Sequence, residues 1–115
     1  MESSVAIVLY KPNLKDLIAT LNNISRFSNA FLSWNSEPVD LISLSKKKSI
    51  DISSTKIYNF FNEYNLGIGG GLNVAFKNAK KLSIKHLLVL DQDSLVLMSK
   101  SKLTKYFQKF SSLRN

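Results

Sequence analysis

The chain has no cysteine, and it has one histidine among its 115 residues. The lack of cysteine excludes disulfides, thiolate metal sites and cysteine nucleophiles, and it fits a reducing compartment. His86 has no second histidine with which to share a metal ion, and its place at the start of an apolar run favours a structural role. The sequence also lacks the nucleophile elbow of serine hydrolases. These absences exclude several common kinds of enzyme site.

Long hydrophobic runs are also missing. The longest apolar stretches are far too short to cross a bilayer. No basic segment precedes the first apolar run, and no small-residue cleavage site follows it, so we find no signal peptide. We therefore expect a soluble, cytoplasmic protein that at most makes peripheral contact with the inner face of an anionic membrane.

Acidic residues are scarce: 16 Lys and Arg oppose eight Asp and Glu, which gives a net charge of +8. Lysines share one helical face at positions 77, 80 and 81, and again at 102, 105 and 109. Two interpretations remain open. The lysines form solvated polar faces, or they attract polyanions such as a membrane surface or a diphosphate ligand. Because no recognised nucleic-acid motif accompanies them, we expect no nucleic-acid partner.

Apolar runs of strand type alternate with stretches whose apolar residues recur at helical spacing. Strands are predicted at Val5–Tyr10, Ala30–Trp34, Lys56–Phe60 and Leu87–Leu90. Helices are predicted at Leu14–Ile24, Val39–Leu44, Leu72–Leu82 and Lys100–Phe110. Asn13 is positioned to cap the first of these helices, with Asp16 in a capping-box position. The segment between Asn62 and Gly71 is predicted to be a loop.

This order of elements predicts an α/β fold with a parallel sheet and right-handed crossovers. Such a sheet starts from a central first strand, winds outward through the second and third, and then places the fourth on the first strand's other side. Ligands bind where the winding reverses, at the carboxyl ends of the two central strands. Those ends are Tyr10-Lys11-Pro12 and Asp91-Gln92-Asp93.

The pair Asp91 and Asp93 is the strongest chemical signal in the sequence. The two carboxylates follow Leu87–Leu90, a continuous apolar run typical of a strand buried on both faces. Charged groups there need solvent or a cation. Carboxylate oxygens suit Mg²⁺ or Mn²⁺, which in turn binds a diphosphate. The alternative is a polar turn that caps the next segment.

The four glycines all lie between Gly67 and Gly71. They do not fit a dinucleotide fingerprint, because Leu72 stands where glycine or alanine is required and the cluster follows the third strand. They do not fit a P-loop either, because Gly-Lys-Ser/Thr is absent. Two interpretations remain: helix amides that face an anion, or a turn that needs positive φ. For Trp34, core packing is favoured over stacking on a base.

Three motifs together resemble the family 2 glycosyltransferases. They are a first strand with a Tyr-x-Pro turn, an Asn-x-Gly segment that leads into a helix, and an Asp-Gln-Asp-Ser ending of the fourth strand. In this chain they comprise Val5–Pro12, Asn65–Asn73 and Leu88–Ser94. The last motif is most similar to the rhamnosyltransferase-like branch. The resemblance covers nearly the whole chain.

This resemblance implies a GT-A fold, which is a Rossmann-like nucleotide-binding unit with a mostly parallel sheet and flanking helices. It implies that Asp91 lies near the ribose of the donor and that Mg²⁺ or Mn²⁺ bridges the donor diphosphate. The implied metal ligands are Asp91 and Asp93. The implied nucleotide-sugar-binding residues are Tyr10, Lys11, Asn35, Asn65, Gly67, Asn73 and Asp91.

The resemblance further implies transfer of a sugar, such as rhamnose from a dTDP donor, to a glycan or lipid-linked acceptor in cell-surface glycan synthesis. In the family the general base and the acceptor side lie downstream of the Asp-x-Asp region. We therefore expect residues 1–115 to be a single domain that forms the donor-binding half, with no catalytic residue of its own. The alternative is a non-catalytic module that binds a nucleotide sugar or a partner.

The chain departs from the family pattern at one turn, and one further expectation follows from the family fold. The family often has an aspartate in the turn after its second strand, where this chain has Trp34. A GT-A sheet also continues past its fourth strand. Ending the chain here is therefore expected to leave Leu87–Leu90 as an open sheet edge, which invites pairing with another copy of the chain.

Overall fold

A computed structural model describes residues 2–113, with side chains up to Lys109. Its strands are β1 (Ser4–Leu9), β2 (Asn29–Trp34), β3 (Lys56–Phe61) and β4 (Leu88–Leu90). Its helices are α1 (Leu14–Ile24), α2 (Leu41–Lys47), α3 (Gly67–Lys81) and α4 (Lys100–Leu113). All strand pairs are parallel, and the strand order is β3-β2-β1-β4. The predicted α/β, Rossmann-like class and the predicted strand order are confirmed.

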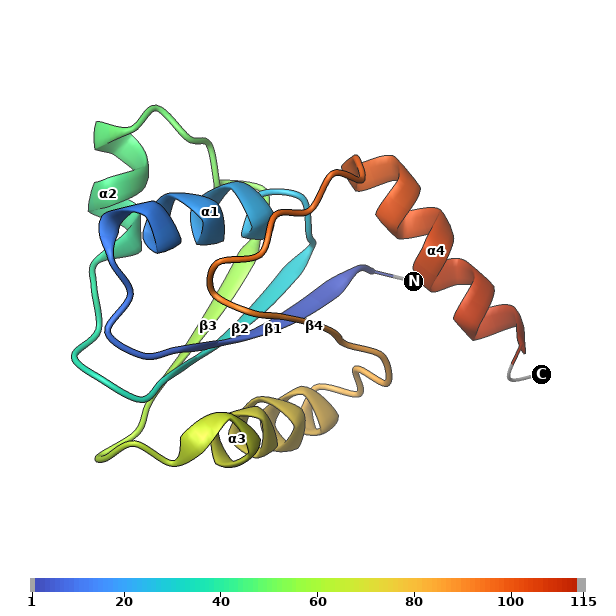
Figure 1. Ribbon diagram of the computed structural model, residues 1–115. Helices are drawn as coiled ribbons and strands as arrows, with labels where there is room; N and C mark the ends of the chain where they lie inside the picture. The colour runs from blue at the N-terminus through green and yellow to red at the C-terminus, as the bar shows by residue number, and fades with distance from the viewer. Residues whose placement is uncertain (1, 114–115) are drawn as a thin grey trace.

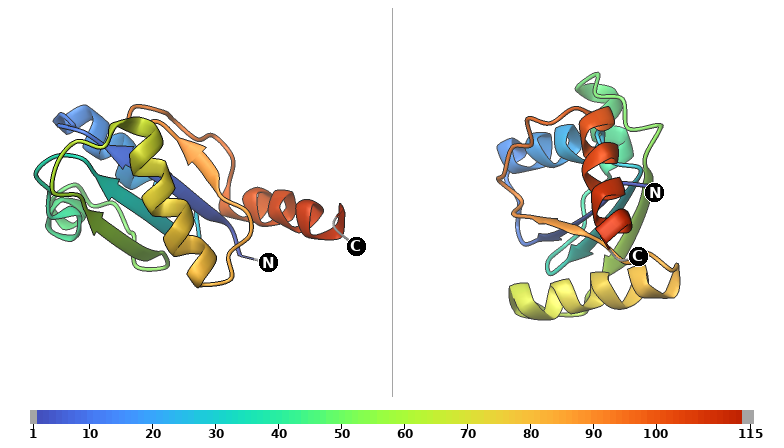
Figure 2. Two further views of the ribbon diagram at one scale, coloured as in Figure 1. Left: turned by 90° about the horizontal axis from the view of Figure 1, so that it is seen from below. Right: turned by 90° about the vertical axis from the view of Figure 1, so that its right-hand side faces the viewer.

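The sheet separates two layers of helices. Helices α1 and α2 lie over one face and α3 lies under the other, while α4 lies near the end of the sheet where the chain begins (Figures 1 and 2). None of the helices in the described part of the chain combines the length and the apolar character needed to cross a membrane.

The core consists of two apolar clusters, one on each face of the sheet. The larger one joins β1 and β2 to α1 and to Leu103 and Phe107 of α4. Trp34 is completely buried in this cluster, and its Nε1 donates to Oδ1 of Asn59 at 2.9 Å. Core packing of Trp34 is thus confirmed, and stacking on a base is not available to it. The side chain of Phe110, with which the last predicted helix ends, is outside the described residues.

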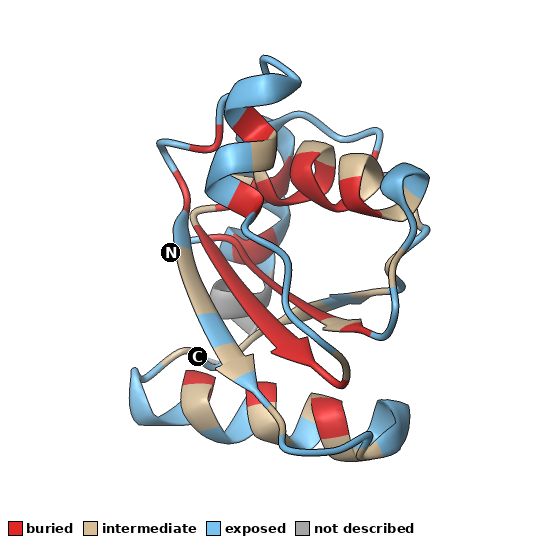
Figure 3. Ribbon diagram, turned by 90° about the vertical axis from the view of Figure 1, so that its left-hand side faces the viewer, coloured by how far each residue is buried: buried red, intermediate tan, exposed pale blue. Residues whose placement is uncertain are grey.

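The smaller cluster lies between the sheet and α3. Small residues, Ala75 and Ala79, bring this helix close to Ala6 and Phe31. The ring of Phe31 stacks on Tyr58 with 4.9 Å between their centroids. Burial is greatest in the two central strands and falls toward both edges of the sheet (Figure 3).

Helix α1 begins as predicted. Asn13 Oδ1 accepts from the backbone N–H of Asp16 at 2.8 Å, and Asp16 Oδ2 accepts from that of Asn13 at 3.3 Å. This reciprocal pair satisfies two backbone donors that a helix start otherwise leaves unpaired. The cap begins three residues after Tyr10, so these hydrogen bonds also hold the end of the turn between β1 and α1.

Helix α2 lies further along the chain than predicted. It covers Leu41–Lys47 rather than Val39–Leu44. The reason is its N-cap: the carboxylate of Asp40 accepts from the backbone N–H of Ser43 at 3.1 Å and from its hydroxyl at 2.9 Å. These hydrogen bonds to Ser43 lower the pKa of Asp40. The negative charge at the helix start is favourable there.

Helix α3 begins at Gly67, so the prediction that residues 62–71 form a loop is wrong for its second half. Glycine is a poor helix former, which explains the prediction. Among the four glycines, Gly67 alone has a positive φ, of 73°. Gly71 is needed for a different reason: a Cβ at this position would lie 2.8 Å from Cγ1 of Val8 on β1. The glycine therefore lets the helix start lie directly against the sheet.

We predict that Gly71→Ala lowers the free energy of unfolding by about 1–3 kcal/mol, because the added methyl overpacks the contact with Val8. Gly69→Ala is the matched control, since a Cβ there meets nothing within 4 Å. It should be neutral or stabilising by up to about 1 kcal/mol, because alanine favours helix over glycine. Urea unfolding of both variants measures the difference, and equal destabilisation would contradict the close approach of α3 to β1.

Strand β4 is an edge strand, as expected from the resemblance, but it is not buried on both faces. Val89 is 42% exposed, and the strand is only three residues long. It pairs with β1 on one side, from Val5↔Leu88 to Ile7↔Leu90. Within residues 2–113 no strand covers its other side.

Candidate functional site

A cavity of about 400 Å³ lies where β1 and β4 end and α3 begins. This is the position at which the winding of the sheet reverses. The cavity brings together residues from four separate parts of the chain. Its lining residues are Val8, Tyr10, Asp16, Asn35, Asn65, Gly67, Ile68, Leu72, Val89, Leu90, Asp91, Gln92 and Asp93.

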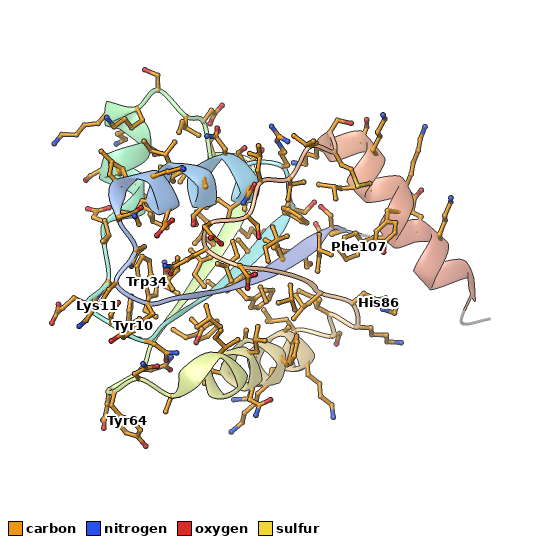
Figure 4. All side chains as sticks on the ribbon, in the orientation of Figure 1. Tyr10, Lys11, Trp34, Tyr64, His86 and Phe107 are labelled. Atoms are coloured by element: carbon orange, nitrogen blue, oxygen red, sulfur yellow. The ribbon has the colours of Figure 1, made fainter. Side chains whose placement is uncertain are left out.

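Most of the site residues predicted from the sequence line this cavity, namely Tyr10, Asn35, Asn65, Gly67, Asp91 and Asp93. Two do not. The Nζ of Lys11 lies 5.4 Å from the centroid of the Tyr10 ring instead (Figure 4). Asn73 is exposed in the second turn of α3, because that helix starts earlier than predicted. In this structure Lys11 and Asn73 therefore lie outside the lining of the cavity, and their predicted contact with a nucleotide sugar stays a prediction.

Gln92, between the two aspartates, connects the ends of β1 and β4. Its Oε1 accepts from the backbone N–H of Tyr10 at 2.8 Å, and its Nε2 donates to the carbonyl of Tyr10 at 3.2 Å. The same Nε2 donates to Asp16 Oδ2 at 3.3 Å. Gln92 thus joins the β1 exit to the start of α1. No local sequence pattern indicates this role of Gln92, because it depends on hydrogen bonds to a residue that is 82 positions away in the chain.

The two aspartates belong to a tight turn. The backbone N–H of Ser94 donates to the carbonyl of Asp91 at 3.1 Å, which closes the turn around Gln92 and Asp93. The polar-turn interpretation is therefore confirmed in part. The turn caps no helix directly, since α4 begins only at Lys100. Both carboxylates remain exposed at the cavity and available to a ligand.

Helix α1 holds the chain that follows this turn. Asn23, which is completely buried, donates to the carbonyl of Ser94 at 2.6 Å and accepts from the backbone N–H of Val96 at 2.9 Å. Thr20 Oγ1 donates to the carbonyl of Gln92 at 3.4 Å, and Arg26 donates to the carbonyl of Val96. Thr20 and Asn23 of α1, together with Arg26 just after the end of this helix, thus fix the position of the turn and of the residues that follow it.

A network of asparagines holds the other wall of the cavity. Asn35 is almost completely buried. Its Nδ2 donates to the carbonyl of Gly67 at 3.0 Å, and its Oδ1 accepts from the backbone N–H of Leu66 at 3.3 Å and from Nδ2 of Asn62 at 2.9 Å. Asn65 Oδ1 accepts from the N–H of Gly67 at 2.9 Å. Both asparagines line the cavity, yet these hydrogen bonds are committed to the fold.

This network fixes the direction of α3. Asn35 and Asn65 satisfy the N–H groups of Leu66 and Gly67, whereas the amides of the next residues in the first turn have no carbonyl within the helix to bond. Gly67 and Ile68 line the cavity. The positive end of the helix dipole is therefore near the same cavity as the two aspartates.

The donor set fits a metal ion only when a ligand adds to it. No group of three or more acidic, histidine or cysteine side chains able to hold a metal occurs in the described part of the chain. Mg²⁺ is nevertheless bound in many proteins by one or two carboxylates together with water and substrate phosphates. The pair Asp91 and Asp93 matches that arrangement. These residues fit a cation that arrives with a diphosphate rather than a permanent metal centre.

Comparison of the chain with protein-family models, with curated proteins and with solved structures found no match.

Proposed function

We propose that this chain binds a nucleotide-sugar donor in the 400 Å³ cavity, with a divalent cation between the donor diphosphate and the two aspartates. One observation carries the proposal. A carboxylate pair and the start of a helix line the same cavity, at the reversal point of a parallel sheet. That is where open α/β sheets bind their ligands.

Electrostatics favours a cation in this arrangement. Asp16, Asp91 and Asp93 line the cavity, so an anionic diphosphate alone would be repelled. A cation held by Asp91 and Asp93 would reverse the sign of the field at that wall. On the opposite wall, the first turn of α3 would offer backbone amides to the phosphate oxygens. The two walls together suit a complex of Mg²⁺ or Mn²⁺ with a diphosphate.

The proposed roles of the residues follow from their places in the cavity. Asp91 contacts the ribose and the cation, and Asp93 binds the cation. Tyr10 offers an exposed ring beside the cavity on which a base can rest. Gln92 does not contact the donor in this proposal. It keeps the aspartate turn at a fixed distance from the end of β1.

Donor binding is the part of glycosyl transfer that this cavity supports best. The third carboxylate, Asp16, is engaged in the cap of α1 and with Gln92, so we assign no general base to it. We propose that the chain contributes the donor side of a glycosyltransferase of the family 2 type, with a donor such as dTDP-rhamnose and a glycan or lipid-linked acceptor. Binding of a nucleotide sugar without transfer is the second candidate, and the same lack of an assigned base favours it.

Calorimetry can test the donor site directly. We expect dTDP or UDP to bind at least about tenfold more tightly with Mn²⁺ than without it, which corresponds to about 1.4 kcal/mol. The monophosphate dTMP is the matched control ligand, and it should show a smaller metal effect because it offers the cation fewer phosphate oxygens. We also expect Mn²⁺ alone to bind weakly. Equal affinity for dTDP in both conditions would refute the metal-bridged site.

A further inference from the structure

Strand β3 forms the edge of the sheet on the side away from β4 and α4 (Figure 1). The backbone N–H groups of Lys56 and Asn62 donate to carbonyls on the β2 side, at 2.9 and 3.0 Å. Because alternate residues of a parallel strand bond to the same neighbour, Ile57, Asn59 and Phe61 direct their backbone N–H and C=O groups to the outer edge. Within residues 2–113 no strand pairs with that edge.

Little in β3 protects this edge from another strand. Proteins usually blunt an edge strand with a proline, a bulge or several charges. β3 contains no proline, pairs with β2 residue for residue, and carries Lys56 as its only charge. A groove of about 430 Å³ adjoins the edge, lined by residues 38–42 and by the three outward-directed residues of β3. Two of its apolar side chains, Ile42 and Phe61, are 60% and 64% exposed.

The charge along this edge is divided between its two ends. Although the chain has 16 Lys and Arg residues, none occurs in residues 27–45 or 57–76. These segments bring only acidic side chains to the end where β3 finishes and α2 begins, namely Glu37, Asp40 and Glu63. The opposite end has Lys56 and the lysines at positions 46–48, against one acidic residue, Asp51. The edge is therefore acidic at one end and basic at the other.

We propose that a second copy of this chain pairs with the outer edge of β3, antiparallel and around a two-fold axis at Asn59. In this register Ile57 lies opposite Phe61 of the second copy, so each outward-directed residue meets another and exchanges both backbone hydrogen bonds with it. Tyr58 lies opposite Phe60 of the second copy, and aromatic pairs of this kind stabilise neighbouring strands. The two sheets thus form one continuous sheet.

The antiparallel orientation also brings unlike charges together. Lys56 comes opposite Asn62 of the second copy and next to its Glu63. Within one chain seven positions separate Lys56 from Glu63, or about 23 Å along an extended strand, so the two cannot pair within one copy. By the same symmetry the acidic start of α2 points toward the lysine-bearing end of α2 in the second copy. A second copy therefore carries the complementary charges by construction.

Other occupants match this edge less well. An anionic membrane would be repelled by the three carboxylates at the end of β3. It would also not supply the regular donors and acceptors that the backbone of an open edge requires. A strand of another protein could form the backbone hydrogen bonds, but it would need a matching charge at each end. The candidate donor cavity shares no lining residue with the groove, so pairing at β3 leaves that cavity open.

Sedimentation equilibrium of the parent chain should show a concentration-dependent dimer. Lys56→Glu and Glu63→Lys should each raise its dissociation constant by about tenfold or more, because each change places like charges together. An equimolar mixture of the two variants should restore dimerisation to within about threefold of the parent, because both contacts then join unlike charges again. A parent chain that stays monomeric, or a mixture that dimerises no better than its components, would overturn the proposal.

Lys80→Glu on α3 is the matched control for Lys56→Glu. It makes the same change in net charge on a different element, so it should alter the dissociation constant by less than about twofold. Lys56, Glu63 and Lys80 are all exposed, and the variants are therefore expected to melt like the parent chain. Equal weakening by Lys56→Glu and Lys80→Glu would overturn the assignment of the contact to β3.

Amide hydrogen exchange followed by NMR locates the backbone pairing. The N–H groups of Ile57, Asn59 and Phe61 should be protected at high protein concentration and exchange quickly after dilution. Those at positions 58 and 60 bond toward β2 and should stay protected at both concentrations. Concentration-dependent protection at Leu88–Leu90 instead would overturn the proposal in favour of pairing through β4. A monomer that binds phosphatidylserine vesicles through the β3 edge would overturn it in favour of a lipid surface.

Discussion

Asn35→Ala is expected to lower the free energy of unfolding by about 2–4 kcal/mol, because one buried side chain makes three hydrogen bonds between separate elements. The change leaves the N–H of Leu66 and the carbonyl of Gly67 without their partner, and it removes an acceptor from Asn62. The start of α3 should then lose its fixed position against β1. We therefore also expect weaker binding of dTDP with Mn²⁺, although Asn35 donates nothing to the ligand in our proposal.

Asn78→Ala provides the control for this prediction. It also replaces an asparagine with alanine, but in the middle of α3, where the Nδ2 of Asn78 donates to the carbonyl of Val74 one turn earlier. Alanine is a better helix former than asparagine, so this variant should be neutral or slightly stabilising. Urea unfolding and calorimetry on both variants separate the effects. If Asn35→Ala unfolded at the same urea concentration as the parent chain, the asparagine network would not hold the helix.

The sequence predicts those elements whose signals are local. The cap of α1 is visible as Asn13 followed by Asp16, and its hydrogen bonds are present as expected. The four strands are visible as apolar runs, and their order follows from the handedness of parallel crossovers. The observed ends of the helices and strands differ from the predicted ends by a few residues, because capping side chains determine where a helix begins. The Asp40 cap of α2 is one example.

The start of α3 could not be predicted from local propensity. Four glycines in five residues indicate a loop, yet Gly67–Gly71 form the first turn of a helix. The hydrogen bonds that hold this turn come from Asn35, about thirty residues earlier in the chain. The misplacement of Asn73 has the same origin. A helix that starts at Leu72 would place Asn73 in its first turn, whereas in the observed helix it is in the second turn and exposed.

The sequence predicts those parts of the candidate site that follow from the topology of the sheet. It does not predict those parts that depend on contacts of individual side chains. The order of the parallel strands places Tyr10 and the two aspartates at the same end of the sheet. In the structure all three residues line one cavity. Lys11 was expected beside them. It has a positive φ of 43°, and its backbone N–H donates to Ser36 Oγ at 2.7 Å. No local pattern reveals that turn, nor the bonds of Gln92 to both backbone groups of Tyr10.

Asp93→Asn is expected to weaken binding of dTDP in the presence of Mn²⁺ by about ten- to a hundredfold, or about 1.4–2.7 kcal/mol. A neutral amide is a poorer ligand for a hard cation than a carboxylate. Without Mn²⁺ the same variant should bind dTDP no more weakly than the parent chain. Removing one negative charge near the phosphates reduces repulsion when no cation is present. The sign of the effect should therefore depend on the metal.

This reversal separates a ligand to the cation from a residue that only supports the fold. A structural role for Asp93 would weaken binding equally with and without Mn²⁺, and that result would contradict our proposal. Asp51→Asn is the matched control: Asp51 is also exposed, accepts from the backbone N–H of Ser53 at 2.9 Å, and lies on none of the donor cavity's walls. It should leave both titrations unchanged. Asp91→Asn should lose affinity in both conditions, because we assign Asp91 a contact with the ribose as well as with the cation.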